Sequence, residues 1–301
     1  MRLEEVMNNN SVNLPNYEEI LIPSSGTQIA LSIWKSNSKS NPSIVFIPGT
    51  MTHPLFYSPF LNEICKKGYN VIGIHHLSHG KSPREIKAFT IDHMIANVKD
   101  TITYVIENFN ENVGLMGSSQ GGVLSISLAG LDNRIKAVFP HNILLTSLKE
   151  SIKVTRFPNW LAPLYNPIIG VMKLGAKIMP KKQLAMGFYL DADKVFSTKE
   201  WKDYFYTDPI GMTKYPMSFL ASLFACDMSH ITDGSIICPV VVLVSKGDPL
   251  FIKEYSDLVY EKIKCKTKEK VEFDIDSHLI FNECLDSVID RVVEKLDKYM
   301  K

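Results

Sequence analysis

The feature that most constrains this chain is a repeated alternation between short apolar runs and longer stretches with helical periodicity. It begins with an apolar run at residues 44–47, followed by a helical stretch at 56–66 and a second apolar run at 71–74. Such alternation is typical of βαβ units, in which helices join parallel strands. The sequence therefore predicts an α/β fold with a mostly parallel central sheet flanked by helices.

Further elements extend this pattern in both directions. Two β-rich segments, residues 18–22 and 29–34, are separated by the turn residues Pro23-Ser24-Ser25-Gly26-Thr27, which predicts an entry hairpin. Downstream, apolar residues at helical spacing predict a helix over 91–109 with Thr90 as its cap. The remaining predicted elements are strands at 113–116, 137–139, 240–244 and 271–273 and helices at 120–131, 255–263 and 285–299.

The alternation is interrupted between residues 143 and 238. This stretch lacks a βα rhythm and contains many aromatic residues and six prolines, at positions 158, 163, 167, 180, 209 and 216. We expect an α/β core formed by residues 1–142 and 239–301, and an inserted, mostly helical cap formed by residues 143–238.

The strand at 113–116 runs into Gly117-Ser118-Ser119-Gln120-Gly121, a Gly-x-Ser-x-Gly sequence, and then into an apolar helix. A serine on such a sharp strand-to-helix turn has a strained backbone, and the residues two before and two after it are crowded, which favours glycine there. The turn also places the serine hydroxyl at the positive end of the helix. Ser119 is therefore the candidate nucleophile, although the pentapeptide alone also occurs as an ordinary glycine-rich turn.

A serine nucleophile needs a base and a carboxylate that orients the base. Asp248 follows the apolar strand at 240–244 and His278 follows the strand at 271–273, so both lie where a parallel sheet builds its site. We predict Asp248 as the orienter and His278 as the base, with Asp274 and Asp276 as weaker acid candidates. Taken singly, Asp248 is also explained as a turn residue and His278 as a surface histidine.

Two backbone amides are the candidates for stabilising an oxyanion. One belongs to Gln120, directly after the nucleophile, and the other to the loop Pro48-Gly49-Thr50-Met51-Thr52-His53, in which we choose Thr50 ahead of Met51. His53 either lines the pocket or is an exposed loop histidine. The adjacent His75 and His76 point to opposite faces of a strand, which argues against a shared metal ion.

The composition excludes several classes of function. The formal charge is +1, so no global field favours nucleic acid, and five scattered cysteines without a CxxC pair argue against a disulfide framework or a zinc site. The chain contains no apolar run long enough to span a bilayer, and its N-terminus, with Glu4 and Glu5, has no apolar signal region. We therefore expect a cytoplasmic protein that needs no cofactor or metal.

Several motifs together resemble the α/β-hydrolase superfamily, within it the branch of monoglyceride lipases, lysophospholipases and proline-iminopeptidase-like hydrolases. They are Pro48-Gly49-Thr50, His79-Gly80-Lys81-Ser82, the turn around Ser119, Gly247-Asp248 and His278. The resemblance implies a Ser119-His278-Asp248 triad and an oxyanion hole formed by the amides of Thr50 and Gln120. The chain departs from the family at Pro48-Gly49, where His-Gly is frequent, and at residues 75–80, where Asp-x-Arg-Gly-His-Gly is frequent.

The most consistent function is hydrolysis of carboxylic esters, including monoacylglycerols or lysophospholipids. An amidase or peptidase, an acyltransferase or thioesterase with the same triad, and a non-catalytic binding protein are the alternatives. A peptidase would need acidic residues in the cap, where Asp191, Asp193 and Asp227 are available. The apolar stretch 160–179, with Lys173, Lys177, Lys181 and Lys182, either contacts acyl chains or a membrane surface or packs its apolar face on the core.

Overall fold

The computed structural model describes residues 16–301 and has a central sheet of eight strands within that range. The inference about the N-terminal signal region falls on residues 1–15, outside the described residues. The strand order is β1-β2-β4-β3-β5-β6-β9-β10, and all neighbours pair in parallel except β1 with β2 and β2 with β4. The predicted mostly parallel α/β sheet is therefore confirmed. The strands are β1 (Tyr17–Ser24), β2 (Thr27–Trp34), β3 (Ser43–Ile47), β4 (Asn70–His75), β5 (Val113–Ser118), β6 (Ile135–His141), β9 (Val240–Ser245) and β10 (Lys268–Phe273).

The entry hairpin forms as predicted. Ser24 pairs with Thr27, so the turn consists of only Ser25 and Gly26. Both have positive φ, 51° and 74°, which is the conformation of a type I′ turn. This turn type follows the natural twist of two antiparallel strands, and it explains why the hairpin is so short.

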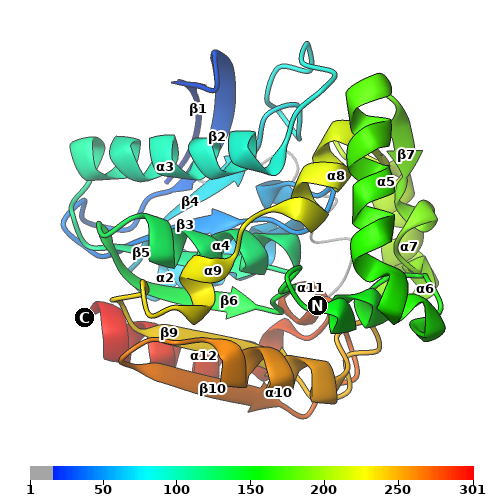
Figure 1. Ribbon diagram of the computed structural model, residues 1–301. Helices are drawn as coiled ribbons and strands as arrows, with labels where there is room; N and C mark the ends of the chain where they lie inside the picture. Colours follow the sequence, from blue (N-terminus) through cyan, green and yellow to red (C-terminus); the bar gives the residue numbers. More distant parts are fainter. Residues whose placement is uncertain (1–15) are drawn as a thin grey trace.

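Helices cover both faces of the sheet (Figure 1). The helices α2 (Ser58–Lys66) and α12 (Leu285–Met300) contact each other on one face, and α3 (Ile91–Asn108) and α4 (Gln120–Leu131) contact each other on the other. α10 (Lys253–Lys262) packs against β9, and the short helices η1 (Pro54–Tyr57) and α11 (Ile280–Glu283) adjoin α2. Thr90 is the N-cap of α3, as predicted.

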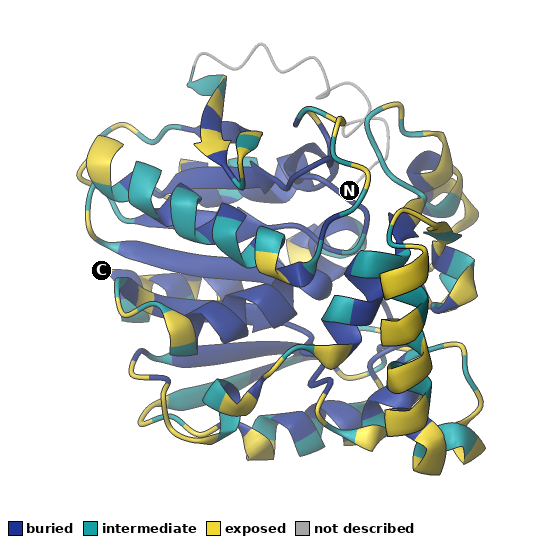
Figure 2. Ribbon diagram, turned by 45° about the horizontal axis from the view of Figure 1, so that its top comes forward, coloured by how far each residue is buried: buried dark blue, intermediate teal, exposed yellow. Residues whose placement is uncertain are grey.

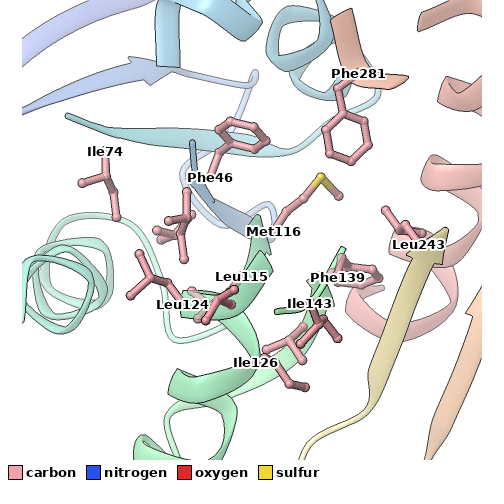
Figure 3. Close-up of a cluster of buried hydrophobic side chains, with 14 of the residues drawn as sticks. Phe46, Ile74, Leu115, Met116, Leu124, Ile126, Phe139, Ile143, Leu243 and Phe281 are labelled. Carbon is pink, nitrogen blue, oxygen red and sulfur yellow. The ribbon is translucent and has the colours of Figure 1, made fainter. Parts of the chain in front are cut away.

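The core lies on both sides of the middle strands. Figure 3 shows Met116 of β5 directed toward Phe46 and Phe281, whereas the preceding residue, Leu115, is directed toward Leu124 of α4. This alternation follows from the two-residue repeat of a strand. All six residues of β5 are buried, because helices cover both faces of the sheet.

Most of the chain between β6 and β9 gathers at the carboxyl ends of the parallel strands, and its last part returns along α4 (Figure 1). It is mostly helical and also contains a small antiparallel pair, β7 with β8, which the sequence did not predict. Its elements are η2 (Lys149–Val154), η3 (Asn159–Leu164), α5 (Tyr165–Ile178), β7 (Gln183–Ala185), η4 (Met186–Phe188), α6 (Ala192–Val195), α7 (Lys199–Thr207), β8 (Lys214–Pro216), α8 (Met217–Ala225) and α9 (Ser229–Thr232).

No helix within residues 16–301 is both long enough and apolar enough to cross a membrane. Figure 2 shows that the central strands are almost entirely buried, whereas α5 presents many exposed residues to solvent.

Candidate active site

Ser119 lies between the end of β5 and the start of α4, in a strained backbone conformation. Its φ is 54° and its ψ is −113°, a region that a non-glycine residue adopts at a cost of about 1–3 kcal/mol. The Ser119 amide donates to the carbonyl oxygen of His141 at 2.8 Å, and the Ser119 carbonyl accepts from the amide of Gly122 at 2.8 Å. These bonds to β6 and α4 hold the turn in place.

The two glycines around Ser119 are required by space. A Cβ atom on Gly117 would lie 2.0 Å from the carbonyl oxygen of Gly121, and a Cβ atom on Gly121 would lie 1.9 Å from the carbonyl oxygen of Ile47. Both obstacles are backbone atoms, which cannot move aside as a flexible side chain can. The crowding expected from the Gly-x-Ser-x-Gly pattern is therefore present on both sides of the serine.

His278 and Asp248 form a buried pair. The Nδ1 atom of His278 lies 2.9 Å from Oδ2 of Asp248, and both side chains are at most 2% exposed. The ring of Phe251 stacks on His278, with centroids 5.6 Å apart and planes at 10°. Because Nδ1 faces the carboxylate, Nε2 is the nitrogen left to face a reacting group. The alternative acids Asp274 and Asp276 are both exposed, and Asp274 pairs with Lys246.

The Asp248 carboxylate accepts hydrogen bonds on both oxygens. Oδ1 accepts from the amides of Leu250 and Phe251 at 2.8 and 2.9 Å, and Oδ2 accepts from Nδ2 of Asn142 at 2.8 Å as well as from His278. Burial alone would raise the pKa of Asp248, but the facing His278 and the Phe251 amide hold it below its ordinary value. The carboxylate is therefore ionised at neutral pH.

Asn142 is a residue that sequence reasoning missed. It directly follows β6, and its φ of 61° places it in the left-handed region that asparagine tolerates better than most residues. Its side chain also lies 3.1 Å from Nε2 of the preceding His141. Burial lowers the pKa of His141 to about 3, so His141 is neutral beside the His278–Asp248 pair. A single asparagine after a strand carries no signal in the sequence that would distinguish it from a turn residue.

The loop after β3, residues 48–53, is called the β3 loop here. Thr50 and Ser119 line the same two cavities, whereas the Met51 amide is already bound to the hydroxyl of Tyr215 at 2.8 Å. Gln120 is the first residue of α4, where amides have no partner within the helix. His53 is buried, with its Nε2 atom 2.7 Å from Oδ2 of Asp208, and it does not line either cavity that contains Ser119.

Two cavities share Ser119 in their lining. The first cavity is also lined by His278 and Leu279, and the second by Gln120 and Val123. Both cavities share the lining residues Thr50, Ser119, Leu190 and Leu250. A third cavity lies under α5 and shares Thr155, Tyr189 and Phe224 in its lining with the second. The lining of all three is predominantly apolar.

His75 and His76 do not share a ligand site. The Nε2 atom of His75 lies 2.9 Å from the hydroxyl oxygen of Ser32, and the Nδ1 atom of His75 accepts a hydrogen bond from the amide of Lys81. Within residues 16–301, no group of three or more His, Cys, Asp or Glu residues is arranged to hold a metal ion.

Residues 38–284 match the model of a protein family described as serine aminopeptidase, S33. This range contains Ser119, Asp248 and His278, and it covers most of the chain. No curated protein sequence matches the chain significantly.

Solved structures resemble the fold over nearly its whole length. A monoacylglycerol lipase of Paleococcus ferrophilus has a TM-score of 0.73 at 21% identity, covering 90% of this chain and 99% of its own. A soluble variant of a monoglyceride lipase from Saccharomyces cerevisiae, in complex with a substrate analogue, has a TM-score of 0.76 at 16% identity, with coverages of 96% and 97%. An esterase of Pyrococcus furiosus has a TM-score of 0.63 at 16% identity, with coverages of 95% and 91%. At these identities the likeness concerns the fold.

Proposed function

Because the chain belongs to the serine aminopeptidase S33 family, an α/β-hydrolase family, we propose that it is a serine hydrolase that cleaves carboxylic esters. One observation carries the proposal: His278, bonded to Asp248 at 2.9 Å, lines the same apolar cavity as the strained Ser119. A nucleophile, a base and an orienting carboxylate are the groups that acyl transfer requires.

In the proposed mechanism Ser119 attacks the acyl carbonyl while Nε2 of His278 takes the serine proton. Asp248 holds the imidazole through Nδ1 and stabilises the imidazolium that forms. The amides of Thr50 and Gln120 stabilise the oxyanion of the tetrahedral intermediate. His278 then protonates the leaving alcohol, and water attacks the acyl-enzyme with His278 again as base. No cofactor takes part in these steps.

The two cavities at Ser119 suggest where the halves of an ester bind. The leaving alcohol must sit beside His278, which protonates it, and His278 lines the first cavity. The acyl chain then occupies the second cavity, which adjoins Gln120 and is separated from the third cavity under α5 by the shared residues Thr155, Tyr189 and Phe224. Adjacent cavities with mainly apolar linings favour medium or long acyl chains over acetyl groups. Monoacylglycerols and lysophospholipids are therefore the proposed substrate class.

The test is hydrolysis of p-nitrophenyl esters from acetate to palmitate, combined with labelling by a fluorophosphonate probe. We expect labelling of the wild type, none of Ser119→Ala, and a preference for acyl chains longer than acetyl. Ser118→Ala is the matched control, because it changes the neighbouring serine and leaves the proposed nucleophile in place. A folded wild-type protein that neither labels nor hydrolyses any ester would refute the proposal.

The family description favours an aminopeptidase as the second candidate. An aminopeptidase needs a carboxylate near the substrate ammonium group, but no Asp or Glu of residues 16–301 lines the three cavities. Asp193 pairs with Lys202 at 2.5 Å, and Asp191 and Asp227 accept from nearby backbone amides. Faster turnover of proline p-nitroanilide than of any ester would make the peptidase the better assignment.

We also propose that residues 143–238 act as a cap whose helix α5 meets a lipid surface. Apolar side chains form an exposed stripe along this part of the cap: Trp160, Leu164, Val171, Leu174, Ile178 and Met179. The opposite side of α5 contributes Ile169 and Met172 to the third cavity, so the stripe is not needed for packing there. Four exposed lysines, at positions 173, 177, 181 and 182, adjoin the stripe and favour an anionic surface.

Co-sedimentation with vesicles tests this contact. We expect the wild type to bind phosphatidylglycerol vesicles more strongly than phosphatidylcholine vesicles, and Val171→Asp together with Ile178→Asp to abolish binding. Ile237→Asp is the control. Ile237 is 69% exposed, close to the 72% of Val171 and the 70% of Ile178, but it lies next to the amino end of β9 and outside α5. Equal binding by all three proteins would contradict the proposed surface.

A further inference from the structure

The β3 loop contains a turn that is unusual for its sequence. The amide of Thr52 donates to the carbonyl oxygen of Gly49 at 3.2 Å, which closes a four-residue turn. Its third residue, Met51, has a φ of 62°, whereas Thr50 does not have a positive φ, so the turn is of type II. Glycine is the usual residue at that position, and a methionine there costs about 1–2 kcal/mol. Contacts elsewhere must hold this conformation.

Those contacts come from one segment of the cap, residues 208–215, which we name the clamp segment. The Met51 amide donates to the hydroxyl of Tyr215 at 2.8 Å, and the Met51 carbonyl accepts from the amide of Met212 at 3.1 Å. Both backbone polar groups of the strained residue are therefore bound by residues more than 150 positions later in the chain.

The orientation of the Tyr215 hydroxyl is determined by His79. The Nδ1 atom of His79 lies 2.8 Å from the carbonyl oxygen of Leu77, so Nδ1 carries the proton. Burial lowers the pKa of His79 to about 4, which keeps the ring neutral and leaves Nε2 as an acceptor. The Tyr215 hydroxyl donates to that Nε2 at 2.9 Å, and its oxygen remains free to accept from Met51.

A second anchor joins the same two segments. His53 at the end of the β3 loop bonds through Nε2 to Oδ2 of Asp208 at 2.7 Å, and both side chains are at most 3% exposed. The side chain of Arg84 donates to the carbonyl oxygens of Ile210 and Gly211, which fixes the clamp segment against the core.

We propose that the clamp segment holds the oxyanion-binding conformation of the β3 loop, with Tyr215 as its main positioning residue and Asp208 as the second. The inference rests on the proposed function. Without the clamp, the strained Met51 is free to relax from its positive φ, and the β3 loop loses the single backbone path that directs the Thr50 amide at the oxyanion. The cap thus completes the catalytic site as well as covering it.

Tyr215→Phe tests the proposal. We expect kcat for p-nitrophenyl butyrate to fall on the order of 10-fold, less than the roughly 10²–10³ that loss of an oxyanion donor costs, with KM unchanged. The dissociation constant of a boronic acid inhibitor, which forms a tetrahedral adduct with the serine, should rise by the same factor, because the loop contributes mainly when the oxyanion forms. Hydrogen exchange of residues 49–53 should become faster, which is a readout that does not depend on turnover.

Tyr255→Phe is the matched control. Tyr255 is as buried as Tyr215, and its hydroxyl also accepts from a distant backbone amide, that of Leu145 at 3.0 Å, but it does not contact the β3 loop. We expect this variant to lose thermal stability while keeping the wild-type kcat and wild-type exchange of residues 49–53.

The outcomes separate the two proposals. If the wild type hydrolyses esters and Tyr215→Phe matches Tyr255→Phe in kcat and in hydrogen exchange, the clamp is overturned and the proposed function stands. If the wild type hydrolyses no ester, the proposed function fails, and the hydrogen exchange alone decides whether the clamp holds the loop. Should Tyr215→Phe not fold, Asp208→Asn tests the second anchor, and unchanged kcat and exchange in that variant overturn the proposal.

Discussion

The side chain of Asn142 offers the sharpest test of how the His278–Asp248 pair is held. It donates one of four hydrogen bonds to the Asp248 carboxylate, and it shares Oδ2 with His278. Asn142→Gly removes this donor without adding backbone strain, because glycine adopts the φ of 61° freely. Asn142→Ala removes the same donor but keeps a Cβ atom in the left-handed region.

The expected magnitudes follow from these contacts. A hydrogen bond to a buried charged group contributes about 1.5–3 kcal/mol, so Asn142→Gly should lower the free energy of unfolding by about 2 kcal/mol. Asn142→Ala should lose roughly a further 1 kcal/mol through backbone strain. Loss of orientation in the carboxylate should reduce kcat by about 10-fold, equivalent to about 1.4 kcal/mol in the barrier, and equally in both variants.

Urea unfolding followed by tryptophan fluorescence measures the stabilities, and p-nitrophenyl butyrate hydrolysis at saturating substrate measures kcat. The two variants should therefore differ in stability and agree in kcat. A kcat for Asn142→Gly equal to that of the wild type would refute the positioning role of Asn142. Equal stabilities of the glycine and alanine variants would instead show that the positive φ carries no cost.

Three further predictions concern single sites. Gly121→Ala should lower the unfolding free energy by more than about 4 kcal/mol, because the new Cβ would meet the carbonyl oxygen of Ile47 at 1.9 Å; wild-type stability in urea would contradict this. Burial lowers the pKa of His76 to about 3 in the folded protein. As the pH falls from 7 to 5, His76 therefore takes up a proton in the unfolded chain and stays neutral in the folded protein. This difference lowers the free energy of unfolding by about 2 kcal/mol. His76→Leu should remove that part of the pH dependence, and an unchanged loss between pH 7 and 5 would argue against it. Leu223→Trp, which fills part of the second cavity, should lower kcat/KM for palmitate esters more than for butyrate esters, and a uniform effect on both would place the acyl chain elsewhere.

The order of apolar runs was sufficient to predict the sheet, because strands buried on both faces must be continuously apolar and the helices between them amphipathic. The strand β5, the turn at Ser119 and the helix α4 lie where the local pattern placed them, with α4 spanning the predicted residues. The pairing of His278 with Asp248 could be anticipated because both follow parallel strands, whose carboxyl ends meet at one edge.

The contacts between residues 143–238 and the rest of the chain could not be predicted in this way. The side chains of Tyr215 and Asp208 contact the β3 loop, although both residues lie more than 150 positions after it in the sequence. Local periodicity carries no information about contacts at such a sequence separation. His53 illustrates the point, because a loop histidine is usually exposed and here a cap aspartate buries it. The β7–β8 pair could not be predicted, because strands of three residues each are too short to show an alternating pattern.

The position of the cap between β6 and β9 has a consequence for the order of folding. Val138 of β6 pairs with Val240 of β9, about a hundred residues later, so joining these strands requires closing a loop that costs roughly 4 kcal/mol of chain entropy. The strands β1 to β6 pair over shorter separations and are expected to form first, with β9 and β10 added last. Asp248 and His278 follow those two late strands, so a chain emerging from the ribosome has Ser119 in place long before the proposed base His278. Ester turnover would then report on the final step of folding, in which β9 and β10 join the sheet.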